Sequence, residues 1–216
     1  MHRVIGMREP VNTWTHFVPF LAAIGGLVFI IVNTRGNPAK LMTMVIYAIS
    51  VILLFGASSF YHWLRVSPRK QLLLRKIDHM AIYLLIAGSY TPVLFYGLHG
   101  GWRWVMLGSV WGLALAGILL KLWFINAPRI LSTTLYVFLG WIAVVPFVQL
   151  VKTLPRGAIA LMVAGGISYT VGALIYARKR VNFLPRRLGF HETFHIFVAL
   201  GGLLHFIMMV IYILPM

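Results

Sequence analysis

The chain has 216 residues, of which 61% are hydrophobic, and its 19 basic residues outnumber three acidic ones to give a formal net charge of +16. A water-soluble domain carries about a quarter of charged residues, so a charged fraction of 10% excludes an ordinary soluble protein. The basic residues lie in short segments between apolar runs, which argues against a nucleic-acid partner. The absence of cysteine excludes disulfides and thiolate metal sites.

Apolar runs of about 20 residues, the length that crosses a bilayer as a helix, recur along the chain. They predict an all-α membrane protein, a seven-transmembrane helix bundle in which residues 1–216 form a single domain. The first run follows a polar, basic start and is too long for a signal-peptide core, so we expect it to remain as an anchor. The predicted spans are Trp14–Val32, Leu41–Leu64, Asp78–Leu98, Trp102–Trp123, Leu131–Val151, Gly157–Ala177 and Phe190–Leu214.

The orientation in the membrane follows from the basic residues. The N-terminus and the connections after the second, fourth and sixth spans carry 14 lysines and arginines, and the opposite face carries five. Cytoplasmic loops are enriched in Lys and Arg, so we expect a cytoplasmic N-terminus and an external C-terminus. Most of the excess falls in two predicted basic loops, Arg65–Lys76 and Arg178–Arg187.

Small residues recur every four positions in the fourth span, at Gly108, Gly112 and Ala116. Such spacing lets helix backbones approach closely in a membrane. We expect this face to pack inside the bundle, and a contact between two copies of the chain is the alternative.

Ionisable residues gather at one predicted membrane depth. His191 and His195 open the seventh span at positions i and i+4, which lie on one helix face with Cβ atoms about 5–6 Å apart. The topology brings His62 from the end of the second span and Asp78 from the start of the third to the same side. Ser58 lies one turn deeper than His62 on the same face. Ionisable residues inside a membrane are costly and mark functional sites.

Three imidazoles with one water form the open tetrahedral arrangement of a catalytic zinc site. We therefore predict that His62, His191 and His195 bind Zn²⁺. Asp78 would be the general base, and Ser58 would orient the water or an oxyanion. The alternative is that each histidine is an ordinary hydrogen-bonding residue at a helix end.

His191-Glu192-Thr193-Phe194-His195 also matches the His-Glu-x-x-His signature of zinc proteases, in which Glu is the base. Such enzymes need another ligand downstream. No Asp or Glu follows His195, and His205 lies about 21 Å from His191 along a helix axis. A supporting or loop-pairing role with nearby arginines is therefore favoured for Glu192.

Several motifs together resemble the hemolysin III family, the bacterial branch of the progestin and adipoQ receptor superfamily. The resemblance covers nearly the whole chain and rests on the order and spacing of Glu9–Asn12, Thr15–His16, Ser58–His62, Asp78–His79, Ala87–Pro92 and Gly189–His195.

The resemblance implies a seven-helix fold with a cytoplasmic N-terminus. It also implies that His62, His191 and His195 hold zinc, that Asp78 contacts the water at the metal, and that Ser58 lies beside it. The related adiponectin receptors and alkaline ceramidases imply hydrolysis of lipid amides. The family name implies a pore-forming or haemolytic activity, and bacterial members are linked to membrane-lipid or membrane-energetic homeostasis.

Two functions remain after these observations. The first is a zinc-dependent hydrolase of a lipid amide or acyl bond in the bacterial inner membrane, whose substrate enters sideways from the membrane lipids. The second is a non-enzymatic receptor-like sensor or pore-forming haemolysin with a structural zinc. No repeating charged stripe typical of a pore runs along a span, and the seventh span lacks the lysine that a microbial rhodopsin needs.

Overall fold

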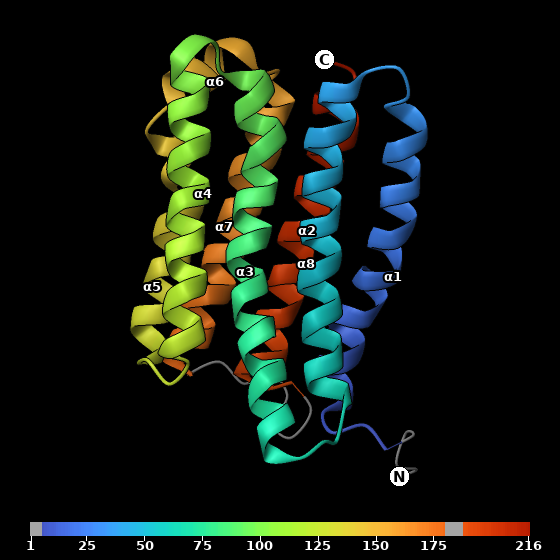
Figure 1. The fold of residues 1–216 in the computed structure, drawn as a ribbon, viewed down its shortest axis with the longest axis vertical. Coiled ribbons are helices and arrows are strands. Elements are labelled where there is room, and N and C mark those ends of the chain that lie inside the picture. The colour runs from blue at the N-terminus through green and yellow to red at the C-terminus, as the bar shows by residue number, and fades with distance from the viewer. Residues whose placement is uncertain (1–5, 180–187) are drawn as a thin grey trace.

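The structure is a computed structural model that describes residues 6–179 and 188–216. Helices account for most of these residues (Figure 1). In chain order they are α1 (Pro10–Asn33), α2 (Pro38–Trp63), α3 (Pro68–Gly97), α4 (Gly100–Trp123), α5 (Arg129–Gly140), η1 (Ile142–Val144), α6 (Phe147–Thr153), α7 (Arg156–Arg178), α8 (Phe190–Met208) and η2 (Met209–Ile213).

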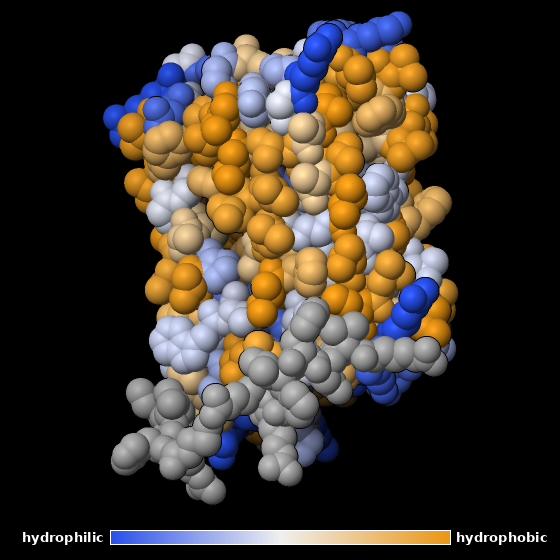
Figure 2. Space-filling model, turned by 180° about the vertical axis from the view of Figure 1, so that it is seen from behind, coloured by the Kyte–Doolittle hydropathy of each residue, from blue (hydrophilic) through white to orange (hydrophobic). Residues whose placement is uncertain are grey.

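The predicted helical membrane bundle is confirmed. Within the described ranges, six helices are long and apolar enough to cross a membrane: α1, α2, α3, α4, α7, and α8 with its η2 extension. The segment from α5 to α6 gives a seventh crossing if its bent halves count as one span. Figure 2 shows largely hydrophobic side chains along the visible face, with hydrophilic ones concentrated towards its two ends.

The third span differs from its predicted bounds. We predicted Asp78–Leu98, but α3 begins at Pro68, so most of the predicted loop Arg65–Lys76 is helical. Proline suits the first turn of a helix, where its missing N–H would have no partner. Asp78 therefore lies well inside a helix rather than at its start. In the other predicted basic loop, residues 180–187 lie outside the described residues.

The fifth span is bent rather than continuous. We predicted one helix over Leu131–Val151, but α5 ends at Gly140 and the two halves meet at 53°. Pro146 explains the break, because a proline inside a helix lacks the N–H donor and clashes with the carbonyl four residues earlier.

Close helix packing occurs where the backbones meet, but not at the predicted small-residue face. A Cβ atom at Gly88 of α3 would lie 2.2 Å from Ser50 Oγ of α2, so these two helices are in intimate contact. A Cβ at Gly108 or Gly112 would have no neighbour within 4 Å. The expected internal face of α4 thus points outward, and Gly117 instead packs against another helix.

The bundle places the first and last long helices of the chain in contact. α1, α2, α3 and α4 follow one another side by side, α7 packs on α8, and α8 also contacts α1 (Figure 1). The starts of α1, α3, α5 and α8 and the ends of α2, α4 and α7 lie at the lower end of Figure 1, with the N-terminus. This end contains the predicted site residues.

Candidate metal centre

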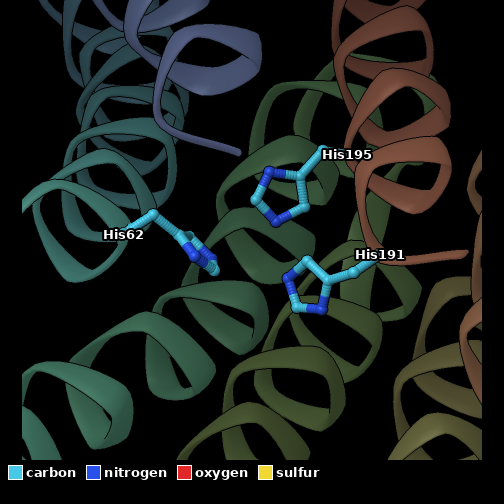
Figure 3. Close-up of side chains that lie close together, drawn as sticks. All are labelled: His62, His191 and His195. Atoms are coloured by element: carbon cyan, nitrogen blue, oxygen red, sulfur yellow. The ribbon is translucent and has the colours of Figure 1, made fainter. Parts of the chain in front are cut away.

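Three histidines from two distant helices meet at this end of the bundle. His62 lies in the last turn of α2, and His191 and His195 lie in the first turns of α8. One ring nitrogen from each lies within 4.8 Å of the other two. Figure 3 shows the three rings directed into the same space between the helices. The structure therefore brings the three predicted ligands together, and they could hold one metal ion.

His62 is fixed by the segment that precedes α1. Its Nδ1 lies 2.6 Å from Glu9 Oε2. The backbone of this segment is tied to the end of α2, since Glu9 N donates to His62 O at 3.0 Å and Arg8 N donates to Trp63 O at 3.1 Å. The hydrogen bond to His62, with a smaller contribution from Arg8, lowers the pKa of Glu9 to about 2.

This contact decides which ring nitrogen of His62 is free. An ionised carboxylate only accepts hydrogen bonds, so Nδ1 of His62 carries the proton and donates it. Nε2 is then the atom with a lone pair. It is buried and has no hydrogen-bond partner among the described residues, as expected for a metal ligand.

His195 is oriented in the same way by α1. Its Nδ1 lies 3.3 Å from the carbonyl oxygen of Asn12 and 3.2 Å from Thr15 Oγ1. Because a carbonyl oxygen only accepts, Nδ1 is a donor here and Nε2 keeps its lone pair. The ring also stacks on His16, with 3.8 Å between the ring centroids. Two of the three imidazoles thus present Nε2 as the available ligand atom.

Asn12 joins the elements around the three histidines. Its Nδ2 donates to Glu9 Oε2 at 3.1 Å and to Glu192 Oε1 at 3.2 Å, a partner 180 residues away in the sequence. Glu9 and Asn12 were not among the predicted site residues. A usable signal was present, because two polar residues before an apolar span are unusual in a chain with only three acidic residues.

Glu192 stabilises the start of α8. Its Oε2 accepts a hydrogen bond from Gly189 N at 3.0 Å, in addition to the contact with Asn12. A carboxylate in the first turn is favourable because it accepts from unpaired backbone N–H groups. Of the arginines that could pair with it, those at positions 180, 186 and 187 lie outside the described residues.

Asp78 and Ser58 share a cavity with two of the histidines. This cavity of about 570 Å³ is lined by Ser58, Asp78, His191 and His195, and by many apolar side chains. Its volume is in the range of small-molecule sites. Asp78 is separate from the group of mutually close ligand atoms, and its Oδ2 lies 3.6 Å from His79 Nδ1.

The hydroxyl of Ser58 has a defined partner. His16 Nε2 lies 3.3 Å from the carbonyl oxygen of His195, so it donates, and His16 Nδ1 is then the acceptor for Ser58 Oγ at 2.8 Å. In this arrangement the lone pairs of the Ser58 hydroxyl can accept a hydrogen bond from a water or a substrate N–H in the cavity.

Comparison with known proteins finds a matching family model and several similar proteins. A family model described as "Haemolysin-III related" matches residues 6–206. The chain is 32% identical to "Hemolysin-3" of Bacillus cereus over 209 residues, covering 96% of this chain and 92% of that protein. It is 36% identical to "Hemolysin-3 homolog" of Bacillus subtilis (strain 168) over 196 residues, covering 90% and 88%. It is also 27% identical to "Adiponectin receptor protein" of Drosophila melanogaster, covering 92% of this chain and 49% of that protein.

Proposed function

The chain belongs to the haemolysin-III related family, and from this premise we propose that it is a zinc-dependent membrane hydrolase that cleaves an amide or acyl bond of a lipid. One observation carries the proposal. Three histidines that could hold one metal ion lie at a cavity that also contains a carboxylate, Asp78, and a hydroxyl, Ser58. A structural metal would not require a proton acceptor or a cavity beside it.

Zinc fits the donor set. Three neutral imidazoles leave a fourth position open for a small molecule, which is typical of catalytic zinc rather than of closed structural sites. The buried Nε2 of His62, which has no partner within the described part of the chain, supports a ligand at that atom. Zinc bound there would supply a Lewis acid that polarises a carbonyl group and makes water more acidic.

The remaining chemistry belongs to side chains of this protein. Asp78 would accept a proton from water in the cavity and return it to the leaving amine or alcohol. Ser58, held by His16 as acceptor, would orient that water through its lone pairs. The apolar walls would take the hydrocarbon of the lipid and exclude bulk water.

The site would work at the cytoplasmic face of a bacterial cell membrane. The uneven distribution of lysine and arginine supports a cytoplasmic N-terminus, and the histidines lie at the same end of the bundle as the N-terminus (Figure 1). Membrane lipids would supply the substrate and could enter the cavity laterally. We connect this activity with membrane-lipid homeostasis.

Metal analysis and hydrolysis of a fluorescent ceramide test the proposal together. Purified wild type should contain about one zinc per chain and release the fatty acid, His195→Ala should lose the metal, and Asp78→Asn should keep the metal but lose hydrolysis. Equal metal content in wild type and His195→Ala would contradict the proposed metal site. Undiminished hydrolysis in metal-free protein would contradict the proposed mechanism.

A further inference from the structure

Three cations line the cavity at the end that contains the histidines. Arg75 of α3, Lys121 of α4 and Arg129 of α5 all contribute to its wall. Their hydrogen bonds within the described part of the chain go to neutral groups. Arg75 donates to Asn126 Oδ1 at 3.4 Å, Lys121 donates to Ser132 Oγ, and Arg129 donates to Tyr176 O at 3.3 Å.

The one carboxylate that shares this cavity, Asp78, forms no ion pair with any of the three cations. Only three acidic side chains exist in the sequence, and all three are described. Glu9 pairs with Arg8 and His62, Glu192 accepts from Gly189 and Asn12, and the ion-pair distance recorded for Asp78 is to His79. No carboxylate lies within 4.0 Å of the three cations among the described residues.

Lys121 makes this imbalance significant, because its side chain is only 1% exposed. A lysine near a membrane surface usually extends its ammonium group to the lipid headgroups, but this one is enclosed between helices. An isolated charge in an apolar interior is strongly unfavourable unless it is paired. The ammonium has three N–H donors, and Ser132 accounts for one of them.

Arg129 lies near the candidate metal centre, and most of the remaining cavity wall is apolar. The guanidinium of Arg129 lies 4.5 Å from the ring centroid of Tyr176, and that ring lies 5.5 Å from the ring of His191. Further along, the wall consists of side chains such as Ile86, Val93 and Met208. One end of the cavity is therefore cationic and the other is hydrocarbon-like.

We infer that the cavity binds an amphiphile with an oxyanion head, a carboxylate or a phosphate, which Lys121, Arg75 and Arg129 hold while its alkyl chain lies along the apolar wall. Guanidinium and ammonium groups bind both oxyanions through charge-assisted hydrogen bonds. This inference goes beyond the proposed function, whose test uses a neutral ceramide, because it assigns an anionic amphiphile to the same cavity. It concerns binding alone, so it does not require the site to be catalytic.

Equilibrium binding of radiolabelled dodecanoate to the full-length protein in zwitterionic nanodiscs tests it, with dodecyl phosphate, dodecanol and inorganic phosphate as competitors. Either dodecanoate or dodecyl phosphate should bind at least roughly tenfold more tightly than dodecanol, since a charged hydrogen bond contributes about 1.5–3 kcal/mol. Tighter binding of the carboxylate would identify a free fatty acid, and tighter binding of the phosphate would identify a phospholipid. Dodecanol binding equally well, or inorganic phosphate competing as well as dodecyl phosphate, would overturn the inference.

Matched variants locate the subsite. Lys121→Gln should weaken anion binding by roughly tenfold and leave dodecanol unaffected, and Arg75→Gln provides the same test if the first variant does not fold. Lys70→Gln is the control, because Lys70 is an exposed lysine at the same end of α3 that does not line the cavity. An equal loss of anion affinity in Lys121→Gln and Lys70→Gln would show that only the net charge of the protein matters. That result would refute the subsite. Measuring binding and ceramide hydrolysis on the same zinc-loaded protein separates the two proposals, because anion binding without hydrolysis there would refute only the proposed function.

Discussion

Glu9 and His62 are 53 positions apart in the sequence, yet Glu9 Oε2 lies 2.6 Å from His62 Nδ1. A carboxylate that accepts from the second nitrogen of a metal-binding histidine fixes the ring orientation and makes the ligand more basic. The segment before α1 therefore contributes to the candidate metal centre without being one of its three possible ligands. This relationship explains why a polar stretch at the start of the chain is folded back on the end of α2.

Replacing Glu9 by Gln should weaken zinc binding while the bundle stays folded. The amide oxygen can still accept from His62 Nδ1, but the negative charge is lost, and changes of such partners lower metal affinity about 10–100-fold. Competition with a zinc chelator measures the affinity. Glu192→Gln is the matched control because Glu192 contacts Asn12 and Gly189 rather than a histidine. Equal affinities in wild type and Glu9→Gln would contradict the role given to Glu9.

Adding zinc to chelator-treated protein should raise its unfolding temperature. Zinc at His62, His191 and His195 would join α2 to α8, and a ligand at 100 times its Kd stabilises the folded state by about 2.7 kcal/mol. The increase should disappear in His191→Ala. It should persist in His99→Ala, since His99 is exposed in the connection before α4. The same response to zinc in both variants would show that the ion binds elsewhere.

Much of the fold was predictable because apolar length is a strong signal. The apolar runs predict the spans, and the described helices follow them except where proline acts locally. Pro68 and Pro146 show why the bounds failed. The first starts a helix in a basic stretch and the second interrupts one in an apolar run, so apolar length alone predicts neither bound. The predicted internal packing of Gly108 was wrong for another reason. Small-residue spacing does not determine which side of a helix faces its neighbours.

The three histidines of the candidate site were predictable from the sequence. An i,i+4 histidine pair and a third histidine at the same depth are visible in the sequence, and the structure brings them together. The contacts of Glu9 and Asn12 were not predictable, because they depend on how the segment before α1 folds back on α2 and α8. The cationic lining of the cavity could not be predicted from the sequence either. In the sequence, Lys121 resembles any lysine at a span end, and only its burial reveals that it faces inward.

Replacing Gly88 by Ala should destabilise the protein. The added Cβ would lie 2.2 Å from Ser50 Oγ and 2.5 Å from Ser50 Cβ, so α2 and α3 would have to separate. Overpacking of this kind costs about 1–3 kcal/mol. Gly108→Ala is the control, since a Cβ there meets no atom within 4 Å, and Ala is favoured over Gly in a helix by about 1 kcal/mol. Denaturation in detergent measures both, and a stable Gly88→Ala variant would show that the contact between α2 and α3 is looser.

Replacing Tyr90 by Phe should destabilise the bend between α5 and α6. The Tyr90 hydroxyl donates to Gly140 O and accepts from Ala143 N at 3.2 Å, so it serves two backbone groups that the broken helix leaves unpaired. Backbone polar groups inside a membrane have no water to replace such a partner, and leaving one unsatisfied costs about 1–3 kcal/mol. Tyr83→Phe removes the same atom from the same helix, but the buried Tyr83 hydroxyl has no partner among the described residues. Its loss should be neutral or slightly stabilising. Thermal unfolding of the two variants should therefore diverge, with Tyr90→Phe below wild type and Tyr83→Phe at or above it; the opposite order would mean that the bend does not depend on Tyr90.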